Sequence, residues 1–305
     1  CPNYNIDQPT RNILIENSNI SGRNYVGGAI GAGRIYNVTS NHNIINGNTY
    51  VGGISGNSGV NSKYAYANSV EVYGSGSNIG GAVGYKNSLS VGKITNSIVE
   101  GTTTSSNNVG GFTGGSAQTF HAIEVNSTKV VSKGNNVGAF IGRTDAGNST
   151  NLYECYAKDC YIEGNNNIGG LVGCVQEGNI WNNYTNTEVI ALGDNAGGIA
   201  GYIKNQNTTN IGDNEIEIYK NNVAGSKVTA NNNIGGLIGK TDKELYLASQ
   251  FIDNYIEAYL TGKDLNTMSL GIGSNKQYNE KLENMHVYRY SSLNGINPNQ
   301  ENDNL

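Results

Sequence analysis

The sequence is poor in proline, in charged residues and in long apolar runs. Only 3 of its 305 residues are proline, and two of these are Pro2 and Pro9. The stretch between Pro9 and Pro298 therefore keeps every backbone N–H that a β-ladder needs. No apolar run approaches the roughly 20 residues of a membrane helix. We expect no membrane insertion and a chain that can form uninterrupted sheets.

Cysteine and histidine are too few and too scattered for a metal centre. Cys155 and Cys160 lie in one extended stretch, about 16 Å apart at strand rise, which is too far for a disulfide. Cys174 could instead reach Cys155 across one repeat; otherwise the cysteines are small buried residues. The three histidines lie in separate repeats without an HExxH motif or a carboxylate partner: His42, His121 and His286. The sequence therefore predicts no metal site and no cofactor.

Charge excludes two further classes of function. Charged residues make up 14% of the chain, and the formal net charge is −5. This balance gives no electrostatic basis for binding nucleic acid. A polysaccharide-cleaving β-helix needs carboxylates gathered on one face, whereas the aspartates occupy differing positions within their repeats: Asp145, Asp159, Asp194, Asp213 and Asp242. We expect these side chains to be solvated in loops and the chain to lack a catalytic site.

The dominant feature of the sequence is a glycine-rich repeat. Glycine accounts for 43 residues, and the octapeptide NYVGGAIG at 24–31 recurs with variations in eight copies, which start 25 to 38 residues apart. A repeat of this length indicates a solenoid, in which each unit buries its apolar face against the next. The glycines of the motif are the predicted structural corners: Gly27, Gly28, Gly52, Gly53, Gly80, Gly81, Gly110, Gly111, Gly138, Gly169, Gly170, Gly197, Gly198, Gly235 and Gly236.

Two columns of apolar residues flank the glycine pair. The residue before the pair and the residue after it are apolar in every copy, as in Ile168 and Leu171. These positions are three apart, so a straight strand would send them to opposite faces. A corner or bulge at the glycine pair would turn both toward one core. One copy has Ala139 after Gly138, so a methyl group must be tolerated there.

These patterns predict an all-β fold. Each repeat holds about three short extended segments separated by glycine or asparagine corners, and none shows a 3.6-residue apolar period. One repeat per turn gives a right-handed parallel β-helix of about nine coils, with roughly 28 residues per coil. We expect a lead-in over 1–12, the β-helix over 13–273 with degenerate last coils, a cap strand over 274–296 and a polar tail over 297–305. The segment 243–260 is compatible with a strand pair or a short helix.

Tyrosine is the one residue type that suggests binding. There are 20 tyrosines, and several fall between the apolar columns. Rings on an outward face would form an amphipathic surface for a protein or a glycan. The alternative is structural, because tyrosine favours strands and its rings can stack along a solenoid. The candidate binding face comprises Tyr153, Tyr156, Tyr161 and Tyr184.

The motif itself, as NIGGLVG at 167–173 and NIGGLIG at 233–239, resembles the GLUG repeat of bacterial surface proteins over about Ile13 to Gly239. GLUG repeats occur in the N-terminal, non-catalytic regions of zinc metallopeptidases that cleave immunoglobulin A1 and related glycoproteins, and in adhesins. The resemblance implies an extracellular β-helix, secreted or attached to the cell wall, with a host protein or glycoprotein as partner. The zinc site of the peptidases does not carry over, because this chain has no HExxH residues to match.

Three hypotheses of function follow. The first is a non-catalytic recognition and spacing module, plausibly placed ahead of a metallopeptidase domain. The second is an adhesin, which differs from the first in what the parent protein contains. The third is a glycan-active enzyme whose residues come from irregular insertions such as 145–150 or 213–217.

Overall fold

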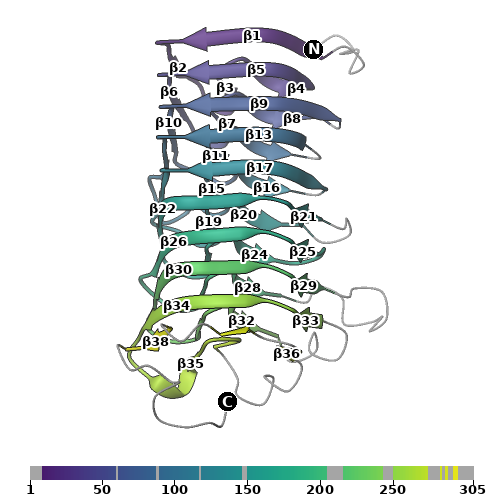
Figure 1. Cartoon of the computed structure of the whole chain (residues 1–305). Helices are drawn as coiled ribbons and strands as arrows, with labels where there is room; N and C mark the ends of the chain where they lie inside the picture. The colour runs from purple at the N-terminus through teal and green to yellow at the C-terminus, as the bar shows by residue number, and fades with distance from the viewer. Residues whose placement is uncertain are drawn as a thin grey trace, which may run out of the picture.

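The computed structural model describes residues 9–59, 61–86, 89–116, 118–145, 150–204, 216–242, 250–273, 282–283, 286–287 and 291–294. Within these residues the chain winds into a solenoid of three parallel sheets, whose turns stack from the N-terminal to the C-terminal end (Figure 1). Sheet A has 21 strands, sheet B nine and sheet C eight. The predicted all-β parallel solenoid is confirmed, with about eight turns in the described part of the chain.

Sheet A receives two segments from each turn. The first segments are β1 (Thr10–Glu16), β5 (Ile35–Asn41), β9 (Ser62–Asn68), β13 (Leu89–Thr95), β17 (Phe120–Asn126), β21 (Leu152–Tyr153), β25 (Ile180–Trp181), β29 (Glu217–Tyr219), β33 (Gln250–Ile252) and β36 (Leu282–Glu283). The second segments are β2 (Asn19–Ser21), β6 (Ile44–Gly47), β10 (Glu71–Gly74), β14 (Ile98–Gly101), β18 (Lys129–Ser132), β22 (Tyr156–Gly164), β26 (Tyr184–Ala191), β30 (Asn222–Thr229), β34 (Tyr255–Thr261), β37 (His286–Val287) and β38 (Ser292–Leu293).

Sheets B and C hold the octapeptide, with the glycine pair between them. Sheet B consists of β3 (Asn24–Gly27), β7 (Thr49–Gly52), β11 (Ile79–Gly80), β15 (Val109–Gly110), β19 (Val137–Gly138), β23 (Ile168–Gly169), β27 (Ala196–Gly197), β31 (Ile234–Gly235) and β35 (Met268–Ser269). Sheet C consists of β4 (Ile30–Gly33), β8 (Ser55–Ser58), β12 (Val83–Lys86), β16 (Thr113–Ser116), β20 (Ile141–Thr144), β24 (Val172–Val175), β28 (Ala200–Ile203) and β32 (Ile238–Thr241).

The glycine pair lies where the chain leaves sheet B. Gly169 ends β23, and Gly170 begins the bend that leads through Leu171 into β24. Ile168 and Leu171, on either side of the pair, are both fully buried in the same core cluster. Both apolar columns of the octapeptide thus contribute to one core, which a straight strand would not allow.

Close approach of backbones, rather than an unusual φ, is what requires glycine at this bend. A Cβ on Gly170 would lie 2.0 Å from the carbonyl oxygen of Gly198 in the next turn. A Cβ on Gly169 would lie 2.0 Å from the carbonyl oxygen of Val172. No real side chain fits at such distances without moving the backbone, and none of the corner glycines has a positive φ.

The left-handed conformation falls instead on the residue just before the apolar residue of strands β3 to β31 in sheet B. Their φ values lie between 54° and 68°. Asparagine is among the few residues that adopt this region readily, which explains its abundance at this position. The column comprises Tyr25, Tyr50, Asn78, Asn108, Asn136, Asn167, Asn195 and Asn233.

The side chains of this column form a ladder along the solenoid axis. Five consecutive amide hydrogen bonds of 2.8 to 3.1 Å join Asn78 to Asn233, one per turn. A shorter and fully buried ladder runs beneath sheet A through Asn183, Asn221 and Asn254. Asn221 Nδ2 also donates to the Ile180 carbonyl at 2.9 Å, and its Oδ1 accepts from the Asn183 backbone N–H at 3.2 Å. The amides of this buried ladder satisfy backbone groups that the bends leave out of the sheets.

The ends of the solenoid differ in places from the expected boundaries. β1 begins at Thr10, within the predicted lead-in, and pairs in register with β5. For 243–260 the sequence was compatible with a strand pair or a short helix. The structure has two strands there, β33 and β34, while 243–249 lies outside the described residues. A short 3-10 helix (η2, Leu265–Thr267) precedes β35, and β36 to β38 extend sheet A. The predicted tail at 297–305 also lies outside the described residues.

The cysteines in the described part of the chain are buried free thiols. Cys155, Cys160 and Cys174 form no disulfide, so the alternative of a bridge between Cys174 and Cys155 is wrong. Burial raises the pKa of Cys155 and Cys174 to about 12 and that of Cys160 to about 11. Because the thiolate is the reactive form, these thiols are chemically inert in the folded protein.

Thiol titration with a chromogenic disulfide reagent tests this state. At about pH 8, where an ordinary thiol reacts readily, we expect a Cys1→Ser variant to show almost no labelling while folded. The same variant should release three equivalents of chromophore in denaturant, one for each buried thiol. Rapid labelling of the folded variant, or fewer than three thiols after unfolding, would contradict the structure.

Candidate functional site

The outward surface of sheet A carries eight aromatic side chains in its last four complete turns. Parallel pairing aligns them in three columns along the axis. We call this surface, between β21 and β34, the aromatic face. Its members are Tyr153, Tyr156, Tyr161, Trp181, Tyr184, Tyr219, Tyr255 and Tyr259.

All four tyrosines of the predicted binding face lie on this surface. Tyr153 lies in β21, Tyr156 and Tyr161 in β22 of the same turn, and Tyr184 in β26 of the next. Tyr156 pairs directly with Tyr184. Tyr219, Tyr255 and Tyr259 are further tyrosines that fall between the apolar columns of the sequence, whereas Trp181 is identifiable as a member only from the register.

The first column is a continuous ring stack. Tyr153 and Trp181 lie 4.6 Å apart with planes at 7°, and Trp181 and Tyr219 lie 5.8 Å apart at 2°. His121 continues the stack above Tyr153 at 4.5 Å. Because the ring faces cover one another, only the ring edges remain for a partner. This column matches the structural alternative, in which aromatic rings stack along the solenoid.

The second column is more open. Tyr156 and Tyr184 lie 6.4 Å apart with planes tilted by 34°, too loosely arranged to cover each other's faces. Tyr156 is 51% exposed and Tyr255 is 41% exposed. Large rings that are accessible and anchored on rigid strands lose little conformational entropy on binding. The second column is therefore the part of the aromatic face best suited to contact a partner.

Tyrosines of the third column are held by neighbouring carboxylates. The Tyr161 hydroxyl donates to Glu163, and the Tyr259 hydroxyl donates to Glu257 at 2.9 Å. The hydrogen bond to Glu163, with partial burial, raises the pKa of Tyr161 to about 12. The Lys129 ammonium lies 5.8 Å from the Tyr161 ring centre. These contacts fix the ring orientation at neutral pH.

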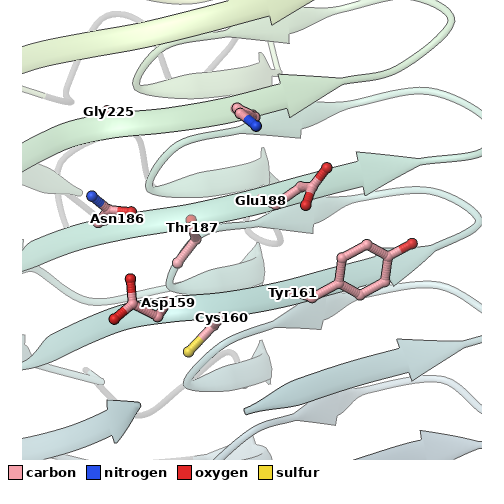
Figure 2. Close-up of a pocket in the computed structure, with 8 residues that line it drawn as sticks. Asp159, Cys160, Tyr161, Asn186, Thr187, Glu188 and Gly225 are labelled. Carbon is pink, nitrogen blue, oxygen red and sulfur yellow. The ribbon is translucent and has the colours of Figure 1, made fainter. Parts of the chain in front are cut away.

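A shallow pocket of about 290 Å³ opens in the middle of the aromatic face. It forms where the register between β22 and β26 shifts by one residue: Lys158 pairs with Asn186, Cys160 pairs with Thr187, and Asp159 has no partner. Figure 2 shows Asp159 and Asn186 on one side of the pocket and Tyr161 and Glu188 on the other.

The lining of this pocket is rich in hydrogen-bonding side chains. Asp159, Asn186, Glu188 and Lys227 offer donors and acceptors at its rim. The Cys160 thiol donates to the carbonyl oxygens of Val125 and Lys158, and burial raises its pKa to about 11. The Thr187 hydroxyl is buried without a hydrogen-bond partner among the described residues. A second shallow pocket, of about 220 Å³, lies at the end of the ring stack and includes Tyr219.

Two expectations about ionisable residues need correction. His121 does have a carboxylate partner, since its Nε2 lies 2.8 Å from Glu154 Oε2. The aspartates are also less solvated than expected: Asp145 accepts from Tyr85 at 2.6 Å and from Arg143 at 3.1 Å, and Asp242 accepts from Tyr202. Asp194 joins an asparagine ladder, whereas Asp159 is exposed and Asp213 lies outside the described residues.

Over the described ranges, no three His, Cys, Asp or Glu side chains gather closely enough to hold a metal ion. None of the helical segments in these ranges is long and apolar enough to cross a membrane. Comparison with protein-family models, with curated proteins and with solved structures finds no match to this chain.

Proposed function

We propose that this chain is a non-catalytic recognition and spacing module of an extracellular bacterial protein. Its partner is a host protein or glycoprotein, which rests on the aromatic face. The observation that carries the proposal is the set of eight outward aromatic side chains in four consecutive turns, of which Tyr156 and Tyr255 are widely exposed. Aromatic residues are the commonest anchors of protein interfaces.

The solenoid supports this role mechanically. Each strand of sheet A from β21 to β34 hydrogen-bonds to strands of both neighbouring turns, so the face is rigid and pre-organised before a partner arrives. Both pockets of sheet A open within it or at its border, and lysine and carboxylate side chains surround the rings. The GLUG-like repeat adds the proposal that the parent protein is a secreted or wall-attached zinc metallopeptidase, with this module ahead of the catalytic domain.

Substitution of the exposed rings tests the proposed face. We expect the double variant Tyr156→Ala/Tyr255→Ala to bind immunoglobulin A1 at least about tenfold more weakly than the original chain, because each exposed anchor contributes on the order of 1 kcal/mol or more. Surface plasmon resonance with immobilised immunoglobulin A1 measures this. The thermal midpoint should fall only modestly, since both rings lie on the surface and, among the described residues, the one ring contact of Tyr255 is its stack on His286 at 4.3 Å.

Tyr36→Ala is the matched control, because Tyr36 is an exposed tyrosine on β5, several turns from the aromatic face. It should leave the affinity unchanged. Equal losses in the control and the double variant would place the interface elsewhere. Cleavage of immunoglobulin A1 by this chain alone, or failure of the original chain to bind this protein and other mucosal glycoproteins, would overturn the proposal.

A further inference from the structure

A third pocket, polar and of about 350 Å³, lies over the outer side of sheets B and C, away from the aromatic face and its two pockets. One wall consists of two adjacent asparagine ladders: the axial ladder, at Asn136 and Asn167, and a neighbouring one through Asn107, Asn135 and Asn166. Arg143, Tyr202 and Lys204 line the rest of the pocket. We call it the amide pocket. Its volume is within the range of small-molecule sites. No carboxylate is among its lining residues, although the chain as a whole has a formal net charge of −5.

The ladder amides present a regular array of hydrogen-bonding groups. Asn136 Nδ2 donates to Asn108 at 2.9 Å, and Asn136 Oδ1 accepts from Asn167 at 2.9 Å. A side-chain amide has two N–H groups and two lone pairs. The two ladder bonds of each amide use one N–H group and one lone pair, which leaves the other half of its capacity. The adjacent ladder repeats the arrangement one residue earlier, where Asn166 donates to Asn135 at 3.0 Å. A ligand bearing several hydroxyl groups would find paired donors and acceptors on this wall.

The rest of the lining carries two cations. Arg143 binds Asp145 through a single Nη2 contact of 3.1 Å, while its Nε is buried with no hydrogen-bond partner. A guanidinium has five N–H groups, four of them on the two Nη atoms. One contact to Asp145 therefore leaves further Nη donors for a ligand on this partly exposed side chain. Lys204 adds a second positive charge from the chain segment that follows β28.

Three carboxylates flank the pocket outside its lining. Asp145 pairs with Arg143 and Tyr85, Asp242 accepts from Tyr202, and Asp194 follows Asn166 along its ladder, where it accepts from Asn232. The Lys240 ammonium lies 5.5 Å from the Tyr202 ring centre and adds a further positive charge nearby. Cys174 lines the pocket as a neutral thiol, because burial raises its pKa to about 12.

We infer that the amide pocket binds an acidic sugar, with the carboxylate on Arg143 and Lys204 and the hydroxyl groups on the amides of Asn136 and Asn167. A guanidinium pairs with a carboxylate through two parallel hydrogen bonds, and a fixed row of amides suits the hydroxyl groups of a pyranose ring. This site is separate from the aromatic face, and its ligand is a sugar unit rather than a protein surface.

Titration calorimetry and amide-resolved NMR test the inference. We expect N-acetylneuraminic acid or glucuronic acid to bind with a millimolar Kd and to shift the side-chain amide signals of Asn136 and Asn167. Neutral glucose should bind at least about tenfold more weakly, since it lacks the charge-assisted pair. Acetate alone should bind weakly and leave the amide signals in place.

Variants identify the residues. Lys204→Gln and Arg143→Gln should each weaken acidic-sugar binding at least about tenfold, and Lys63→Gln on the distant strand β9 should have no effect. Should Arg143→Gln fail to fold through loss of its contact with Asp145, Lys204→Gln alone decides, because the backbone of Lys204 rather than its ammonium group bonds to Val175.

Equal binding of acidic and neutral sugars, unchanged affinity in Lys204→Gln, or acetate that binds as well as the acidic sugars would overturn the inference. Tyr156→Ala/Tyr255→Ala should retain sugar binding, so that failure of the aromatic face and failure of the amide pocket are distinguishable.

Discussion

Replacement of Gly169 and Gly170 together by valine is expected to abolish cooperative folding. Each new Cβ would lie 2.0 Å from a carbonyl oxygen, of Val172 and of Gly198, respectively. Backbone atoms in the interior of a sheet cannot move aside as a flexible side chain can. Overpacking of an ordinary core site costs about 1–3 kcal/mol, and two clashes with backbone should together exceed about 4 kcal/mol of the free energy of unfolding. The turns on both sides depend on this bend for their register.

Urea unfolding, followed by circular dichroism and by the fluorescence of the single tryptophan Trp181, measures this loss. Gly59→Val is the matched control, because a Cβ at Gly59 would lie 3.4 Å from its nearest neighbour, the backbone nitrogen of Arg34. We expect the control to change stability by less than about 1 kcal/mol. A Gly169→Val/Gly170→Val variant that stays folded and loses only a ligand would show that the motif is a binding site rather than a corner.

Asn221→Leu is the second substitution with a large expected effect. Leucine has nearly the shape of asparagine, so the change removes hydrogen bonds without opening a large cavity. The Asn183 backbone N–H and the Ile180 carbonyl would both lose their Asn221 partner in a fully buried site. Each unsatisfied buried group costs about 1–3 kcal/mol, so we expect the free energy of unfolding to fall by roughly 3–5 kcal/mol.

The same urea titration reports this change directly, since Trp181 follows Ile180 in β25. Asn231→Leu provides the comparison, because Asn231 makes one side-chain hydrogen bond, to the Leu192 carbonyl, at an exposed position. Its cost should stay below about 1 kcal/mol. Similar losses in the two variants would mean that the buried ladder contributes no more than a surface contact.

The solenoid fold was predictable because the order of residues within the octapeptide determines where each turn bends. Apolar residues three apart around a glycine pair admit few arrangements other than a bend, and the near-constant repeat length aligns successive bends. The assignment of 243–260 was left open between strands and a helix, because no glycine pair follows this segment to set the period.

The conformations within each turn were less predictable. One column of left-handed residues in sheet A includes Val91, Ala122 and Glu154, at φ of 58°, 51° and 54°. Valine and alanine disfavour this region, so their conformation is imposed by the strands above and below. No local sequence pattern predicts this left-handed conformation at valine or alanine. The buried ladder did have a signal, since Asn183, Asn221 and Asn254 each lie three residues after an inward apolar residue.

The candidate site was predictable in composition and not in geometry. The four tyrosines were expected on an outward face because they lie between apolar columns, and they share that face. The ring stack through Trp181 depends on exact alignment between turns, which the uneven repeat lengths conceal. The pocket beside Asp159 depends on a single unpaired residue in β22, a difference too small to recognise without the register.

The pairing of every strand with its counterparts one turn away has a consequence for the length of the molecule. Duplication or deletion of one repeat inserts or removes a whole layer and leaves the interactions of all other layers intact. The distance between the aromatic face and anything joined to either end would therefore change in increments of about 4.8 Å. Gain or loss of single repeats can therefore change the length of the solenoid stepwise without any change in the packing of its core.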